Sequence, residues 1–156
     1  LEFRRVLFRS NKVWILPNND SGSLIVKKKI IHNKSSDHFL FENLKREDYL
    51  NLLRHSECII GNSSSGIIEA PSFGVPCVNI GRRQNKRIQA KNVINVNKYE
   101  LKKIKLALKK AISYKFRKKL NNLKNPYGDG KSSERILKSL INEKKNKNLL
   151  IKNLTF

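Results

Sequence analysis

The 156-residue sequence contains no methionine, one tryptophan and two cysteines. Cys58 and Cys77 do not have the spacing of a CxxC or zinc motif, and each lies in an apolar run. We therefore expect both to be small buried side chains, without a metal or a disulfide. No apolar run approaches the roughly 18 residues that a membrane-spanning helix needs. No secretory segment is recognisable either, which favours the cytoplasm as the location.

Acidic residues are scarce: 12 Asp and Glu stand against 34 Lys and Arg, which gives a formal net charge of +22. A charge of this size raises nucleic acid as a partner. The lysines, however, are spread along the chain among many Asn and Ile residues, a mixture that AT-rich codons produce. Aromatic residues are not interleaved with them for base stacking. A basic nucleic-acid-binding module is therefore a remote alternative.

The two ends of the chain differ in composition from the rest. Residues 1–10 (LEFRRVLFRS) indicate a non-native linker, because Glu2 and Phe3 are what a common cloning site would encode. A genuine basic amphipathic leader is the alternative. Residues 142–156 form a Lys- and Asn-rich tail that we expect to fray into solvent. Residues 11–141 between them predict one domain.

Short apolar runs alternate with helical patterns along the first hundred residues. Five strands are expected, the first of them buried, at residues 12–16, 38–41, 57–61, 75–80 and 92–96. Helices are expected between them at residues 24–32, 46–56 and 67–73, with Asp20 or Ser21 as the N-cap of the first. This alternation predicts an α/β fold with a Rossmann-like, doubly wound parallel sheet.

The last third of the sequence is predicted to be helical. One long or broken helix is expected over residues 100–119 and another over residues 132–147. The segment between them, NPYGDG at residues 125–130, is dense in turn-forming residues. The fold is therefore expected to end in helices.

Two loops follow predicted strands, at the edge where open α/β sheets bind ligands. The first covers residues 18–23, and the second is Asn62-Ser63-Ser64-Ser65-Gly66. Hydroxyl groups and free N–H groups before a helix favour an anion such as a diphosphate. The alternative is that Ser63 or Ser64 serves only as a helix N-cap.

Charged residues beside the second loop narrow the ligand. Glu69 offers two acceptor oxygens, which suit the vicinal hydroxyl groups of a ribose, although the helix dipole alone also favours an acid there. Arg82, Arg83 and Arg87 follow the fourth predicted strand. Guanidinium groups suit phosphate oxygens, and the alternative is a solvated basic loop. Together these residues point to a nucleoside diphosphate.

The same residues resemble the C-terminal domain of UDP-N-acetylglucosamine 2-epimerases. The resemblance rests on GNSSSGIIEAPSFGVP at residues 61–76, followed by Asn79-Ile80-Gly81 and Arg83-Gln84. PNNDSGS at residues 17–23 and NPYGDG at residues 125–130 agree in order and spacing. The hydrolysing branch, which makes N-acetylmannosamine for sialic-acid-type sugars, is the closer match. The non-hydrolysing branch more usually starts this loop with Asp-Ser-Gly-Gly.

The resemblance implies a GT-B architecture, in which this chain is the C-terminal half and the substrate lies between two Rossmann-like domains. It implies that Ser63 and Ser64 contact the diphosphate of UDP, Glu69 the ribose and Arg83 the phosphate side, while Asn18 lines the same pocket. Weaker candidates for UDP contacts are Ser65, Gly66, Tyr49 and Arg87. For Tyr49, core packing is the favoured interpretation. The resemblance implies no cofactor.

The resemblance also implies that the catalytic acids and bases lie elsewhere. Chemistry in this family involves proton abstraction at C2 of the sugar, elimination of UDP and addition of water. Those groups lie mainly in the N-terminal domain and in a His-containing loop that residues 1–10 replace here. His32, His38 and His55 do not occupy that position. Because a general base must reach its proton, we expect this chain alone to be inactive.

Other functions stay open at this point. A non-hydrolysing epimerase or a GT-B glycosyltransferase would share the fold, which cannot separate these reactions. The expected partners are a UDP-sugar and the missing N-terminal domain of the same enzyme. The parent protein is expected to be a homo-oligomer that does not bind a membrane.

Overall fold

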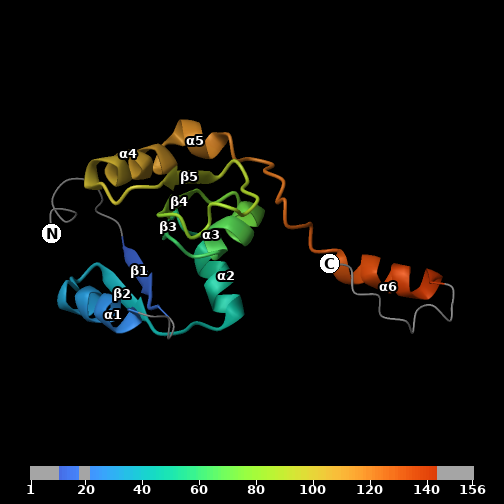
Figure 1. The fold of residues 1–156 in the computed structure, drawn as a ribbon, viewed down its shortest axis with the longest axis horizontal. Coiled ribbons are helices and arrows are strands. Elements are labelled where there is room, and N and C mark those ends of the chain that lie inside the picture. Colours follow the sequence, from blue (N-terminus) through green and yellow to red (C-terminus); the bar gives the residue numbers. More distant parts are fainter. Residues whose placement is uncertain (1–10, 18–21, 144–156) are drawn as a thin grey trace. The chain divides into compact units, whose positions relative to one another are not determined.

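The computed structural model describes residues 11–17 and 22–143 (Figure 1). Their contacts divide the chain into two compact units, one ending at Leu52 and the other starting at Leu53. Each unit has its own parallel sheet. The single domain over residues 11–141 stays a prediction. The proposed linker and nearly all of the Lys- and Asn-rich tail lie outside the described residues.

Unit 1 is built on two parallel strands, β1 (Lys12–Ile15) and β2 (His38–Phe41), joined through α1 (Ser23–His32). The prediction that the first strand is buried is wrong, because Val13, Trp14 and Ile15 are 37–42% exposed. Among the described strands, β1 pairs with β2 alone. Leu16 is the one buried residue in the described part of unit 1. Helix α2 (Arg46–Arg54) spans the boundary between the units.

Helix α1 begins one residue after Gly22, so the predicted cap at Asp20 or Ser21 is wrong. Gly22 has φ 83°, a left-handed conformation that glycine adopts at little cost. Its C=O accepts hydrogen bonds from the N–H groups of Ile25 and Val26. A backbone turn therefore starts this helix where a side-chain cap was expected.

Unit 2 contains three parallel strands in the order β3 (Ile59–Gly61), β4 (Cys77–Ile80) and β5 (Val93–Val96). Val78 and Val96 pack on Ala107 and Ala111 of α4 (Leu101–Ile112), which lies along β4 and β5 in Figure 1. A side chain at Gly66 of the helix that precedes β4 would meet Cys77 Sγ at 2.3 Å, so Cys77 faces that helix. Val78, the next residue on the strand, points to the other face, toward α4. Helices thus cover both faces of the sheet, which confirms the doubly wound α/β prediction.

The helix predicted over residues 67–73 is in fact two short pieces, α3 (Ser65–Ile68) and the 3-10 helix η2 (Ala70–Phe73). Pro71 has no N–H group to donate to the carbonyl of Ile67, so the α-helical pattern cannot continue. The N–H group of Ser72 instead donates to the carbonyl of Glu69 at 3.0 Å. Gly74, at φ 63°, then ends the segment and leads into β4.

The helical region after residue 100 is broken, which was one of the two predicted forms. Ser113 has an extended backbone between α4 and α5 (Tyr114–Lys118), and its Oγ accepts from the N–H group of Phe116 at 3.3 Å. Helix α6 (Ser132–Asn142) follows and buries no residue. None of the helices in the described part of the chain is long and apolar enough to cross a membrane.

Candidate functional site

The first part of the predicted site is the serine loop, residues 62–64, between β3 and α3. Ser63 Oγ accepts a hydrogen bond from the N–H group of Ser65 at 3.3 Å. The carbonyl of Ser64 accepts from the N–H groups of Ile67 and Ile68, both at 2.9 Å. In the described chain no acceptor faces the N–H groups of Ser63 and Ser64, and the Ser64 hydroxyl makes no capping bond. These donors are available to an anion.

The length of α3 changes the source of the expected anion affinity. A longer helix was predicted after the serine loop, and its dipole was expected to help hold a diphosphate. Because α3 has four residues, that dipole contributes little. The attraction must come from local N–H and hydroxyl groups and from nearby guanidinium groups.

Glu69 lies directly after α3 and is half-buried. Its N–H group donates to the carbonyl of Ser65 at 3.0 Å, and its own carbonyl accepts from the N–H group of Ser72 at 3.0 Å. The backbone on both sides of this residue is therefore fixed. A carboxylate on a backbone fixed in this way can accept two hydrogen bonds from a diol.

The second part of the predicted site is the arginine loop, residues 81–90, after β4. Gln84 is 3% exposed, and its Nε2 donates to the carbonyl of Asn62 at 2.9 Å. The carbonyl of Gln84 accepts from the N–H group of Arg87 at 3.1 Å. This residue thus ties the arginine loop to the serine loop, while Arg83 and Arg87 stay exposed. The carboxyl ends of β3 and β4 therefore carry hydroxyl groups, free N–H groups and three exposed arginines, Arg82, Arg83 and Arg87.

The remaining predicted residues have other positions. Asn18 lies outside the described residues. Tyr49 is half-buried on α2, in unit 1. Ser65 and Gly66 are buried, and Gly66 provides the close approach of α3 to β4. The UDP roles of these residues stay predictions.

Sequence reasoning missed several amide side chains that support the two loops. Asn79 at the end of β4 donates to Asn95 at 2.8 Å, and Asn95 donates to Gln89 at 2.7 Å. Asn92 is fully buried and donates to the carbonyls of Gly66 (3.3 Å) and Val75 (2.9 Å). A polar amide inside an apolar strand pattern is a usable signal, because buried amides need partners.

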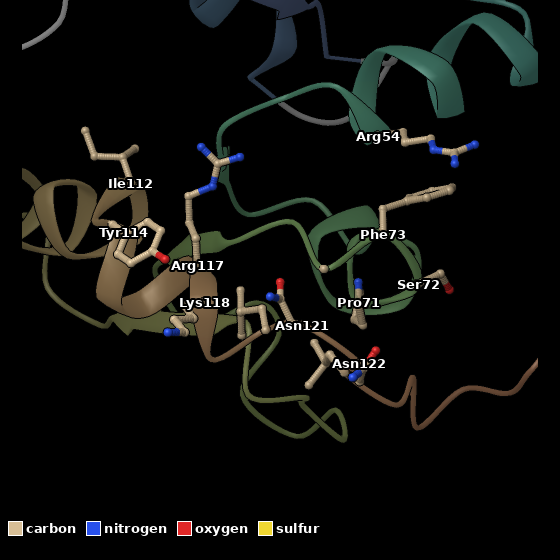
Figure 2. A pocket seen from close by; sticks show the side chains of 13 residues that line it. Arg54, Pro71, Ser72, Phe73, Ile112, Tyr114, Arg117, Lys118, Asn121 and Asn122 are labelled. Carbon is tan, nitrogen blue, oxygen red and sulfur yellow. The ribbon is translucent and has the colours of Figure 1, made fainter.

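A groove elsewhere in unit 2 is distinct from these loops. Figure 2 shows it between η2 on one side and α4 and α5 on the other. Its volume is about 1150 Å³. Its cationic side chains are Arg54, Arg117 and Lys118. None of the predicted UDP-binding residues lines it. The two loops instead carry exposed residues, among them Ser63, Arg83 and Arg87.

The two cysteines are poor nucleophiles. Burial raises the pKa of Cys58 to about 11 and that of Cys77 to about 12. Both are free, Cys77 buried and Cys58 partly so, which agrees with a packing role. Within the described ranges, no three His, Cys, Asp or Glu side chains gather where they could hold a metal ion.

The strand order and the helices on both faces define an α/β protein of the doubly wound class. A family model described as UDP-N-acetylglucosamine 2-epimerase matches residues 3–141. The chain therefore belongs to the UDP-N-acetylglucosamine 2-epimerase family. The matched range includes residues 3–10, which belong to the segment interpreted above as a linker.

Individual relatives agree with this assignment. The UDP-N-acetylglucosamine 2-epimerase of Neisseria meningitidis serogroup B is 38% identical over 66% of this chain and 27% of its own length. The UDP-N,N'-diacetylbacillosamine 2-epimerase (hydrolyzing) of Legionella pneumophila is 38% identical over 79% of this chain and 32% of its own. The chain thus spans about a third, or less, of these relatives.

A solved structure supports the fold. The crystal structure of UDP-GlcNAc 2-epimerase from Neisseria meningitidis, bound to UDP-GlcNAc, matches 84% of this chain and 36% of its own with a TM-score of 0.62. The sequences are 22% identical, so this likeness shows the fold alone. It confirms the predicted fold class, a part of a GT-B structure.

Proposed function

We propose that this chain is the UDP-binding part of a hydrolysing UDP-N-acetylglucosamine 2-epimerase, which releases UDP and N-acetylmannosamine for sialic-acid-type sugars. The observation that carries the proposal is the Gln84–Asn62 hydrogen bond, which joins the serine loop to the arginine loop. A relative from Legionella whose name contains "hydrolyzing" supports this branch. A non-hydrolysing epimerase and a GT-B glycosyltransferase are the alternatives.

In this proposal the two loops hold the leaving group. The Ser63 and Ser64 groups donate to the diphosphate, and Arg83 and Arg87 face its negative charge. That charge grows as the bond between UDP and the sugar breaks, so donors fixed in advance lower the barrier. Glu69 accepts from the ribose hydroxyl groups and keeps the nucleotide in register.

The groups that move protons are proposed to lie in a further domain of the parent enzyme. The chain alone is then expected to bind UDP without releasing it from UDP-N-acetylglucosamine. Incubation of the purified chain with this substrate, followed by a UDP-release assay, checks the point. Turnover at an enzyme-like rate would show that the chain carries its own acid and base.

Titration calorimetry with UDP tests the proposal. Glu69→Ala and Ser64→Ala are each expected to weaken binding about tenfold or more, because each removes hydrogen bonds to a charged or diol partner. Glu57→Ala is the matched control: it removes one exposed carboxylate just before β3. UDP affinity that is equal in all four proteins would refute the assigned site.

A further inference from the structure

We propose that Asn125 and Tyr127 are positioning residues that hold the two walls of the UDP site in register. One wall is the α3–η2 turn that carries Glu69, and the other is the arginine loop. The inference rests on the proposed function. It assigns a role to the NPYGDG segment, whose residues lie 39–57 positions from those they contact.

The first wall has a carbonyl that its own helix cannot satisfy. The carbonyl of Ile68 would accept from residue 71 in a 3-10 turn, but Pro71 has no N–H group. The N–H group of Ser72 is already engaged by Glu69. Asn125 Nδ2 supplies the missing donor to Ile68 at 2.8 Å and also reaches Ser72 Oγ at 2.7 Å.

That contact fixes the direction of Glu69. The peptide unit between Ile68 and Glu69 has its N–H group bonded to Ser65 and its carbonyl bonded to Asn125. This peptide plane is held at both ends, and the Glu69 carbonyl accepts from the N–H group of Ser72. The backbone on both sides of Glu69 is thus fixed, and with it the direction of the Cα–Cβ bond. Asn125 therefore acts on the nucleotide through Glu69 and does not need to touch it.

The second wall is held by Tyr127. Its hydroxyl group donates to the carbonyl of Ile88 at 3.0 Å, one residue after Arg87. Gln84, at the other end of the same loop, donates to Asn62. The arginine loop is thus bonded to the serine loop at one end and to the NPYGDG segment at the other.

The turn that carries both residues is itself rigid. Asn125 Oδ1 accepts from the N–H group of Tyr127 at 2.9 Å, and the carbonyl of Asn125 accepts from the N–H group of Gly128 at 3.2 Å. Only the amide orientation with the NH₂ group toward Ile68 satisfies every partner. One short turn therefore bonds to the wall that carries the carboxylate and to the wall that carries the arginines.

The test is a double-mutant cycle on UDP affinity, measured by calorimetry on the 156-residue chain at a temperature where circular dichroism shows each variant folded. Asn125→Asp keeps the Oδ1 acceptor and removes both N–H donors. It is expected to weaken UDP binding about tenfold in the wild-type background and less than about twofold in the Glu69→Ala background. Asn121→Asp, which adds the same charge to an exposed residue earlier in the same segment, is the matched control.

Tyr127→Phe provides a second, milder variant should Asn125→Asp unfold. We expect it to weaken UDP binding about threefold, because one hydrogen bond is lost. Tyr114→Phe, on an exposed tyrosine of α5, is its control and leaves the affinity unchanged.

The outcomes separate the two proposals. Equal losses from Asn125→Asp in both Glu69 backgrounds would show general loosening and would overturn the positioning role. Wild-type UDP affinity in both Asn125→Asp and Tyr127→Phe would also overturn it, while leaving the UDP site in place. A wild-type chain that does not bind UDP overturns the proposed function and this inference with it.

Discussion

The two parallel sheets of this chain differ in how far they are buried. All of Cys77, Val78 and Asn79 on β4 are at most 3% exposed, whereas Val13, Trp14 and Ile15 on β1 are 37–42% exposed. β4 has a strand on each side and helices on both faces, while β1 pairs with β2 alone among the described strands. Unit 2 thus has a core of its own. The serine loop extends from its edge strand β3, and the arginine loop extends from its central strand β4.

This difference teaches where the precision of the site comes from. A binding site needs side chains held by well-packed elements beneath them. The loops after β3 and β4 stand on a sheet against which α3 packs so closely that a Cβ atom at Gly66 would lie 2.3 Å from Cys77 Sγ. We therefore expect unit 2 to be the more stable unit and to hold the residues of the proposed nucleotide site in place.

The largest expected effect compares a buried residue of unit 2 with an exposed strand residue of unit 1. Ile67→Ala removes a fully buried side chain of unit 2 and is expected to cost about 3 kcal/mol of unfolding free energy. Ile15→Ala on β1, where the side chain is 42% exposed, is expected to cost about 1 kcal/mol. Urea unfolding followed by circular dichroism, and by the fluorescence of Trp14 for unit 1, measures both. Similar costs would remove the contrast between the units.

A smaller effect is expected from a single methyl group. Gly66→Ala places a Cβ atom 2.3 Å from Cys77 Sγ and is expected to destabilise unit 2 by about 2 kcal/mol. Adding Cys77→Ala removes that sulfur and should restore part of the loss. The same urea experiment measures both variants. A double variant no more stable than Gly66→Ala would show that the clash is not the cause.

Acid should affect unit 1 through Asp37. Hydrogen bonds from Lys12 and then Ser35 hold the pKa of Asp37 below its ordinary value of 3.8. A lowered folded-state pKa stabilises the fold above pH 3.8, and this contribution is lost as the pH falls toward the lowered value. The urea concentration at the midpoint of the Trp14 fluorescence change should therefore be lower at about pH 3 than at neutral pH. The decrease should be smaller in Asp37→Asn, which lacks the carboxyl group. Parallel pH profiles in the two proteins would contradict this assignment.

The smallest expected effect is an absence of reaction in unit 2. With pKa values of about 11 and 12, the thiols of Cys58 and Cys77 carry almost no thiolate at neutral pH. Iodoacetamide should label neither in the native chain and both in urea. Mass spectrometry of the labelled chain measures this, and rapid native labelling would show that the β3–β4 region opens.

The sequence predicts the fold well where apolar runs decide it. All five strands lie within the expected segments, although β3 and β4 start two residues late. β4 begins at Cys77 because Pro76 has no N–H group for the ladder. The exposure of β1 was not predictable, because it depends on which strands pair with β1. The helix start at Gly22 was not predictable either, because it depends on the backbone conformation of that residue.

The residues of the candidate site stand out in the sequence, whereas the contacts that arrange them do not. The order of serines, Glu69 and Arg83 indicated a nucleotide. The break at Pro71 could have been inferred, since proline cannot donate within a helix. The contacts of Gln84 and Asn125 could not, because nothing local specifies partners 22 and 57 residues away.

The most direct test of a UDP site in unit 2 is thermal unfolding of the intact chain with and without millimolar UDP. A ligand that binds the folded state raises the midpoint according to its affinity. We predict that UDP raises the midpoint followed by circular dichroism in the wild type, and much less in Glu69→Ala. An identical shift in both proteins, or no shift in the wild type, would contradict the account.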